Sequence, residues 1–300
     1  MPFVPWLIGL AGRWWWFAEL FTHFRFQWLL GTGAIGLVLL FARQWVPLAL
    51  CGVAALILGG PLLRGAFFAD ETLVSEFRDV GIRVVTANVL TRNRNAALLL
   101  DYLDDVEPDV LCLQEIDARW AEDLEPLYAR YPYRRVEPRP DNFGMAVFSK
   151  RPATFNTIDC GGVPLIRCTV EMDDGRPSLT IYNVHTFPPI GAEYAALRNR
   201  QMAQVADLAA WSGGPVLVGG DLNCTPWSPH FADLRTAGGL DDPRLGGRGP
   251  TSWRAGNPLF ALPIDHLLPG GGAGLMRLRA GPDIGSDHRP LSARVFTGSP

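Results

Sequence analysis

Polar side chains follow the apolar runs of this chain at the points where the predicted strands end. The clearest run is Val216–Val218, after which Gly219 and Gly220 let the backbone turn and Asp221 and Asn223 follow at once. Side chains at positions i and i+2 of a strand point the same way, so a carboxylate and an amide would project together from a buried strand. The alternative is an Asx-rich turn that closes a core strand, since Asp and Asn are common turn residues.

Several other apolar runs end in the same manner. The residues at their ends are Asn88, Glu115, His185, Asp265, and Asp287 with His288. Singly, each has an ordinary explanation: a histidine after a strand is usually a hydrogen-bonded polar residue, and an Asp-His pair occurs by chance. Together they form one chemical set, because oxygen ligands with few imidazoles suit a hard cation such as Mg²⁺ or Mn²⁺. Such an ion neutralises a phosphoryl group while His and Asp move protons.

Other catalytic classes lack their signatures in this sequence. There is no G-x-S-x-G elbow, no glycine-rich P-loop and no G-x-G-x-x-G motif, which argues against a serine hydrolase, an NTPase and a nucleotide cofactor. The five cysteines show no zinc-like spacing, and pairing of Cys160 with Cys168 across a hairpin stays open.

Charge is unevenly distributed along the 300 residues. Residues 1–65 hold four arginines and one acid, and the remainder carries 23 basic and 29 acidic residues, a formal net charge of −6. A domain of that sign has no general attraction for polyanions, so tight sequence-independent DNA binding is not predicted.

The elements that must position these residues lie in a globular domain over residues 80–300. Predicted strands cover 82–88, 109–115, 142–149, 165–171, 179–185, 216–221, 263–268 and 291–295, and predicted helices cover 95–106, 118–129 and 192–211. The stretch from 222 to 256 is expected to be irregular. Because strands and helices mix without strict alternation, a layered α/β sandwich is favoured over a single doubly wound sheet.

The segment before this domain is strongly apolar. Residues 25–64 contain two uncharged runs of 17 and 20 residues, bracketed by Arg25, Arg43 and Arg64. At about 1.5 Å per residue each run spans roughly 25–30 Å, which predicts a transmembrane helical hairpin turning at Arg43. Residues 1–24, rich in Trp, are expected to form an interfacial helix, with a third span as the alternative. Residues 65–79 are a predicted linker.

From residue 82 to 296 the chain resembles the endonuclease/exonuclease/phosphatase superfamily, whose fold is that of DNase I. The resemblance rests on six motifs in the family's order: Thr86-Ala-Asn88, Leu113-Gln-Glu115, Asn183-Val-His185, Gly220-Asp-Leu-Asn223, Ile264-Asp265-His266 and Ser286-Asp-His288. The apolar N-terminus is similar to the membrane-anchored, YafD-like bacterial branch. The resemblance implies a four-layer α/β/β/α sandwich with a divalent metal at the mouth between the sheets.

The same resemblance implies metal-binding roles for three residues. Glu115 would be the principal ligand, with Asn88 supporting the metal site and Asp287 near the ion. Some members carry an acidic ligand two residues after the first-motif asparagine. That position is Leu90 here, which favours one metal over two.

Catalytic roles are implied for five further residues. Asp221 would orient or deprotonate the attacking water, and Asn223 would hold a phosphate oxygen. His185 would contact the scissile phosphate, and His288 would polarise it or assist proton transfer. Asp265 would pair with a histidine, most naturally one of these two, and fix its tautomer.

The function expected from the sequence is a membrane-anchored, metal-dependent phosphodiesterase or phosphatase that uses in-line attack by water. Its substrate would be a nucleic acid, a phospholipid or a small phosphate ester, and its N-terminal helices would lie in the lipid bilayer. The alternative is a catalytically idle membrane protein that uses the sandwich for binding. Arginine counting favours a cytoplasmic domain on a multi-pass cell-membrane protein, whereas the similar branch favours an extracytoplasmic one.

Overall fold

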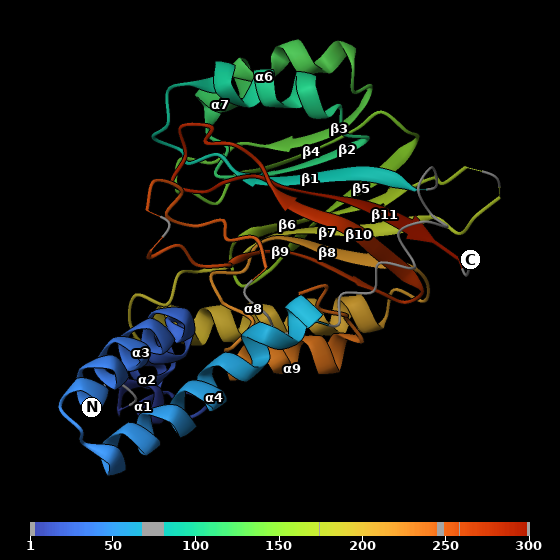
Figure 1. The fold of residues 1–300 in the computed structure, drawn as a ribbon. Helices are drawn as coiled ribbons and strands as arrows, with labels where there is room; N and C mark the ends of the chain where they lie inside the picture. Colours follow the sequence, from blue (N-terminus) through green and yellow to red (C-terminus); the bar gives the residue numbers. More distant parts are fainter. Residues whose placement is uncertain (1–3, 68–80, 174, 245–248, 258, 299–300) are drawn as a thin grey trace.

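The computed structural model describes residues 4–67, 81–173, 175–244, 249–257 and 259–298. Two β-sheets lie face to face, with helices outside each of them (Figure 1). The six-stranded sheet has the order β10 (Ala273–Ala280), β11 (Leu291–Thr297), β1 (Ile82–Asn88), β2 (Val110–Gln114), β4 (Met145–Ser149), β3 (Tyr133–Glu137). The five-stranded sheet has the order β5 (Ala153–Asp159), β6 (Pro164–Val170), β7 (Leu179–His185), β8 (Val216–Asp221), β9 (Asp265–Gly270).

Helices form the two outer layers of the sandwich. The six-stranded sheet is covered by α6 (Ala96–Val106), α7 (Ala118–Asp123) and the 3-10 turn η1 (Glu125–Ala129). The five-stranded sheet is covered by α8 (Ala192–Ala210) and α9 (Pro229–Gly238). The predicted two-sheet α/β sandwich is therefore confirmed.

The central strands are buried on both faces. One apolar cluster, which includes Val84, Val110 and Leu217, fills the space between the sheets. Two further clusters lie beneath the helix layers, one around Trp120 and one around Phe231. Such burial explains why these strands are continuous apolar runs in the sequence rather than alternating ones.

Two buried amides join the sheets directly beneath the strand ends. Gln114 Nε2 donates to Asn183 Oδ1 over 2.6 Å, and Asn183 Nδ2 donates to the carbonyl of Leu113 over 3.0 Å. Both amides are fully buried. They fix β2 against β7 just before Glu115 and His185 leave their strands.

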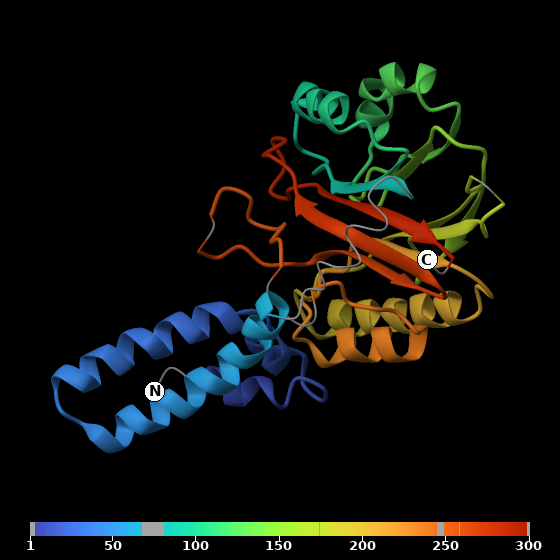
Figure 2. The same ribbon diagram turned by 45° about the vertical axis from the view of Figure 1, so that its right-hand side comes forward.

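Four helices precede the sandwich: α1 (Val4–Gly9), α2 (Trp16–His23), α3 (Arg25–Phe41) and α4 (Trp45–Phe67). In Figure 2, α3 and α4 form an antiparallel pair that projects away from the sandwich. The chain reverses at Arg43, whose φ is 56°. The stretch Trp45–Leu63 is long and apolar enough to cross a membrane, and α2 and α3 meet that test only together, with a bend of 67° between them.

Several sequence expectations differ from the structure. Residues 4–23 form two short helices, where one interfacial helix over 1–24 was expected, because the chain turns between α1 and α2. Residues 65–67 belong to α4, and the rest of the predicted linker lies outside the described residues. The stretch expected to be irregular contains α9, which begins at Pro229 with Ser228 as its N-cap. The strands β3, β5 and β10 were not predicted, and Cys160 and Cys168 are free thiols.

Candidate active site

The strand register brings the predicted residues to one end of the sandwich. Parallel pairing of β1 with β2 places Asn88 beside Gln114 at the carboxyl ends of both strands. Parallel pairing of β7 with β8 places His185 beside Asp221, and antiparallel β9 brings Asp265 opposite Asp221. Residues from both sheets therefore meet at the same edge.

Asp221 lies at the centre of this group. Its Oδ2 is 3.7 Å from His185 Nε2, 3.7 Å from His288 Nε2 and 3.2 Å from Asn88 Nδ2. Its Oδ1 accepts a hydrogen bond from the backbone N–H of Asn223 over 2.8 Å. The carboxylate thus faces two histidine rings while a backbone donor fixes its orientation.

Asp265 pairs with His288. His288 Nδ1 lies 2.8 Å from Asp265 Oδ2, and both side chains are buried. Burial alone would lower the pKa of His288, but the charges of Asp265 and Asp221 and the hydrogen bond to Asp265 outweigh it and raise that pKa to about 10. His288 is therefore an imidazolium at neutral pH, with Nδ1 on Asp265 and Nε2 turned to Asp221.

The other two members of the group shift towards their neutral forms. Burial raises the pKa of Asp221 to about 7, against the opposing charge of His288. Burial also lowers the pKa of His185, although Glu115 opposes it. The site therefore combines a carboxyl that titrates near neutrality, a neutral imidazole and an imidazolium.

Glu115 is held beside this group by a strained turn. Its φ is 65°, in the left-handed region that a bulky side chain rarely adopts. Oε1 accepts from Asn88 Nδ2 over 3.0 Å, and Oε2 accepts from the backbone N–H of Thr91 over 3.0 Å. Strain of this kind persists where surrounding contacts fix the backbone, as at functional sites.

The last two predicted residues lie at the side of the cluster. Asn223 donates its amide to the carbonyl of Thr186 over 2.9 Å. Asp287 Oδ2 accepts from Trp253 Nε1 over 3.3 Å, while its Oδ1 is buried and has no hydrogen-bond partner among the described residues. The structure thus brings the eight predicted residues to one end of the sandwich.

The donor set fits a hard divalent cation. The carboxylates of Asp221 and Asp265 offer ligand atoms that lie within 4.8 Å of one another, and Asn88 links Asp221 to Glu115. In the part of the chain that the structure describes, Asp265 Oδ1, like Asp287 Oδ1, is buried without a hydrogen-bond partner. Buried carboxylate oxygens that lack partners are costly, and a cation would offset that cost.

An aromatic wall beside His185 was missed from the sequence. The ring of Phe143 lies 5.1 Å from the His185 ring and 4.6 Å from that of Phe187, centroid to centroid. Phe187 in turn contacts Tyr194, which is 40% exposed. These rings come from three separate segments, so no local sequence pattern marks them.

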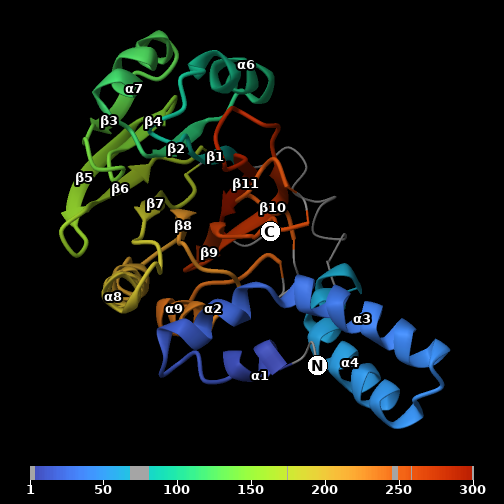
Figure 3. The ribbon, with the colours of Figure 1, turned by 90° about the vertical axis from the view of Figure 1, so that its left-hand side faces the viewer.

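A buried ion pair that reaches the site from the N-terminal helices was also missed. Arg198 Nη2 donates to Glu19 Oε2 over 2.5 Å, and Ser228 Oγ donates to Glu19 Oε1 over 2.5 Å. Arg198 Nη1 also donates to the carbonyl of Asn223 over 3.3 Å. Figure 3 shows α2, which carries Glu19, lying against the sandwich beside α9. The sequence does hold a signal, because Glu19 is the only acid in residues 1–65.

The strand-end residues lie within a match to a known protein family. The model described as "Endonuclease/Exonuclease/phosphatase family" matches residues 85–288, which span the strand-end residues from Asn88 to His288. The chain belongs to the endonuclease/exonuclease/phosphatase family. The family resemblance seen in the sequence is thus confirmed.

Solved structures share the fold of this family member at low sequence identity. TDP2 from D. rerio, in complex with a single-strand DNA product, is 17% identical with a TM-score of 0.59, covering 73% of this chain and 100% of that one. Beta toxin from Staphylococcus aureus, with bound magnesium ions, is 16% identical with a TM-score of 0.57, covering 71% and 99%. An endonuclease/exonuclease/phosphatase from Beutenbergia cavernae is 20% identical with a TM-score of 0.56, covering 73% and 72%. Comparison with curated protein sequences gives no significant match.

Proposed function

We propose that this chain is a membrane-anchored, divalent-metal-dependent phosphoesterase that cleaves a P–O bond by in-line attack of water. The observation that carries the proposal is the contact of one buried carboxylate with two imidazoles, since His185 Nε2 and His288 Nε2 each lie 3.7 Å from Asp221 Oδ2. Together with membership of a family of nucleases and phosphatases, this arrangement supports proton transfer beside a phosphoryl group.

Each side chain has a distinct task in this scheme. Asp221 accepts the proton of the attacking water, because a pKa of about 7 lets it act as a base near neutral pH. His288, kept cationic by Asp265, stabilises the negative charge on a phosphoryl oxygen. His185 donates a hydrogen bond to the scissile phosphate as a neutral imidazole, and Asn223 offers its remaining amide proton to another oxygen.

Glu115 and Asp287 would hold Mg²⁺ or Mn²⁺, supported by Asn88. Asn88 acts by positioning, since its Nδ2 contacts both Glu115 and Asp221, whereas its Oδ1 accepts from the backbone N–H of Leu90. When bound, the ion supplies positive charge that neutralises the phosphoryl group and orients it for attack. Asp221 would hold the water on the side of phosphorus opposite the leaving oxygen, so that the new P–O bond forms as the bond to the leaving group breaks.

The N-terminal helices are proposed to anchor the enzyme in a bilayer. The pair α3 and α4 exposes large apolar side chains, among them Val38, Phe41, Val46 and Leu56. We place the catalytic domain outside the cytoplasm, on a multi-pass anchor. A tethered domain with a negative charge suits a lipid-linked or small phosphoester at least as well as nucleic acid.

The test uses the full-length chain in detergent. Turnover of bis-p-nitrophenyl phosphate, single-stranded DNA and phospholipid micelles is measured with Mn²⁺ or Mg²⁺ and again with EDTA. We expect EDTA to abolish hydrolysis and Asp221→Asn to lower kcat by about 10²–10⁴-fold, whereas Asp241→Asn, at an exposed position, should leave it unchanged. Full turnover by Asp221→Asn, or in EDTA, would contradict the mechanism. Metal binding without turnover of any substrate would favour a binding role.

A further inference from the structure

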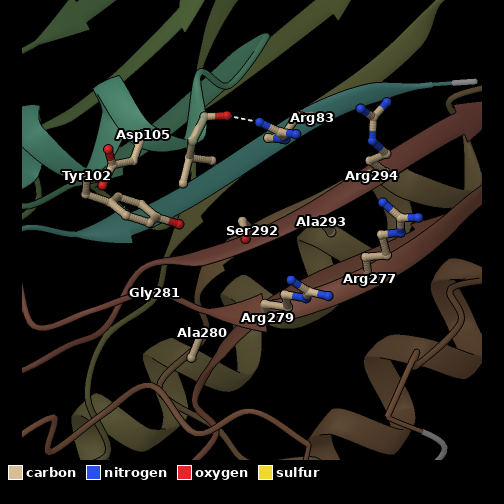
Figure 4. Close-up of a pocket in the computed structure, with 11 residues that line it drawn as sticks. Arg83, Tyr102, Asp105, Arg277, Arg279, Ala280, Gly281, Ser292, Ala293 and Arg294 are labelled. Atoms are coloured by element: carbon tan, nitrogen blue, oxygen red, sulfur yellow. Dashed lines mark hydrogen bonds between the residues drawn. The ribbon is translucent and has the colours of Figure 1, made fainter. Parts of the chain in front are cut away.

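A second polar pocket lies on the outer face of the six-stranded sheet, away from the strand-end site. It encloses about 340 Å³ where β1, β11 and β10 run beside α6 (Figure 4). Arg83 at the start of β1 lines it, whereas Asn88 of the active site ends the same strand. Five residues of strand separate the two positions by roughly 17 Å.

Four arginines from three neighbouring strands line this pocket: Arg83, Arg277, Arg279 and Arg294. Arg83 donates to the carbonyl of Val106, and Arg294 Nη1 donates to the carbonyl of Gly81 over 3.4 Å, so backbone acceptors hold both side chains in place. Arg277 and Arg279 are exposed on β10. The four arginines line one pocket in a chain whose formal net charge is −3.

Among the described residues, these arginines have no carboxylate partner. Within the described part of the chain, no carboxylate lies within 4.0 Å of any of the four guanidinium groups. Asp105 is the acid that lines the pocket, so the lining carries three positive charges in excess. Excess charge of this size, in side chains whose forks match phosphate oxygens, indicates an anion with more than one negative charge.

The buried hydroxyl of Tyr102 is an independent sign of a ligand. The residue is only 7% exposed and lines the pocket, and among the described residues its hydroxyl faces the hydroxyl of Ser292 without a well-formed hydrogen bond. Gly281 makes room for the ring, since a Cβ at that position would lie 2.9 Å from it. Figure 4 shows the hydroxyl directed towards Ser292 and the arginine side of the pocket. Only one of two facing hydroxyls can donate to the other, and a bound anion would supply an acceptor for the remaining O–H.

We propose that this pocket binds a phosphate group as a site separate from the catalytic centre. The arginine forks take the phosphate oxygens, and the hydroxyls of Tyr102 and Ser292 donate the remaining hydrogen bonds. The phosphate has two chemical sources, the headgroup of an anionic phospholipid or a soluble phosphate compound. Binding here does not require the proposed hydrolysis, so each can fail alone.

Calorimetric titration of the full-length chain in detergent tests the proposal. Pyrophosphate is added in the presence of EDTA, and short-chain phosphatidic acid is added in a parallel series. We expect saturable binding that weakens by about tenfold or more in Arg277→Ala with Arg279→Ala. Arg200→Ala, at an exposed position of α8, should bind as the wild type does, and so should His288→Ala in the catalytic centre. Tighter binding of phosphatidic acid would assign the lipid headgroup, and tighter binding of pyrophosphate the soluble compound.

Tyr102→Phe separates a ligand-binding hydroxyl from a merely buried one. The hydroxyl of Tyr102 has no well-formed hydrogen bond to a described residue, so its removal should leave Tm unchanged or slightly higher. Pyrophosphate binding should weaken about fivefold. Two results would overturn the proposal. One is the absence of binding to the wild-type chain, and the other is binding that neither the arginine substitutions nor Tyr102→Phe weakens.

Discussion

At the scale of single residues, the strand-end cluster assigns different protonation states to chemically similar groups. Asp265 stays ionised because, despite its burial, the charge and hydrogen bond of His288 lower its pKa. Asp221, which lies opposite Asp265 in the pairing of β8 with β9, has its pKa raised to about 7 by burial. Two such carboxylates beside imidazoles can divide the roles of positioning group and base.

Replacement of Asp265 by Asn should lower the pKa of His288. Burial lowers the pKa of His288, and the charge of Asp265 opposes this effect. Without that charge we expect the pKa of His288 to fall by about 1–3 from its value of about 10. Because that pKa lies above the ordinary value of about 6.5, the pair stabilises the fold fully below pH 6.5 and loses this effect as pH rises through about 10. Imidazole proton shifts in metal-free protein, with His230 as internal reference, measure the change. An unaltered His288 titration would refute the pairing.

Much of the site was predictable at this scale, because motif residues follow buried strands whose ends must meet. The eight predicted residues do come together. Their exact partners were not predictable: Asp287 turns to Trp253, and Phe143 packs on His185, through contacts between segments far apart in the sequence. The sequence also gave no means of choosing between His185 and His288 as the partner of Asp265.

At the scale of elements, the close approach of β8 to β7 requires glycine. Gly220 has a φ of 132°, and a Cβ there would lie 1.9 Å from the carbonyl oxygen of Val184. Gly220→Ala should therefore destabilise the fold by more than about 3 kcal/mol. Gly214→Ala, where the Cβ would meet nothing within 4 Å, is the matched control. Thermal unfolding compares the two variants. Equal Tm values would show that β7 and β8 can move apart to accommodate the Cβ without loss of stability.

The ion pair between α2 and α8 should couple the N-terminal helices to the sandwich. Glu19→Gln leaves Arg198 buried beside a neutral partner, and loss of a charge from a buried pair costs about 3–5 kcal/mol. We expect a lower Tm and a lower kcat, because Arg198 also contacts the carbonyl of Asn223. Glu193→Gln, at an exposed position of α8, should have neither effect.

A double variant tests whether charge or packing dominates this contact. Replacing Glu19 with Leu and Arg198 with Met removes both buried charges, and we expect it to recover most of the lost Tm. If Glu19→Gln alone behaves like Glu193→Gln, α2 is not held by this pair.

Elements with strong apolar periodicity were predictable, whereas those formed by tertiary pairing were not. β5 exposes about every second residue and β10 alternates Arg with apolar positions, so each is stabilised as a strand mainly by its neighbour. α9 has a weak apolar face, and its start depends on the Ser228 cap followed by Pro229. Local sequence therefore favoured an irregular segment there.

At the scale of the whole molecule, the N-terminal helices and the sandwich meet through polar contacts. Arg13 forms a two-point ion pair with Asp233 of α9, and Gln27 Nε2 donates to the carbonyl of Leu259 over 2.9 Å. These contacts, with the Glu19 pair, tie the domain to the base of the α3–α4 pair. If these helices lie in a bilayer, the domain is held at its surface.

Membrane anchoring predicts a specific sensitivity in α4. Leu56 is 76% exposed, and an arginine there should disfavour insertion by about 2.5–3.5 kcal/mol if it sits near the centre of the bilayer. We expect Leu56→Arg to increase the fraction released from membranes by carbonate, relative to Trp211→Arg on the exposed surface of the sandwich. A reporter fused after Pro300 should be active only outside the cytoplasm. Release of the wild-type chain by carbonate would contradict the anchor.

The most direct test of the account is to measure Mn²⁺ binding and phosphodiester turnover together, in the wild-type chain and in Glu115→Gln. The substitution keeps the shape of the side chain but removes the charge proposed to hold the ion. We predict that wild-type turnover follows Mn²⁺ occupancy, and that Glu115→Gln weakens binding by about tenfold or more and loses turnover while its Tm stays close to that of Glu122→Gln. Equal Mn²⁺ affinity and equal turnover in Glu115→Gln and the wild type would contradict the assignment of this strand-end cluster as a metal-dependent phosphoesterase site.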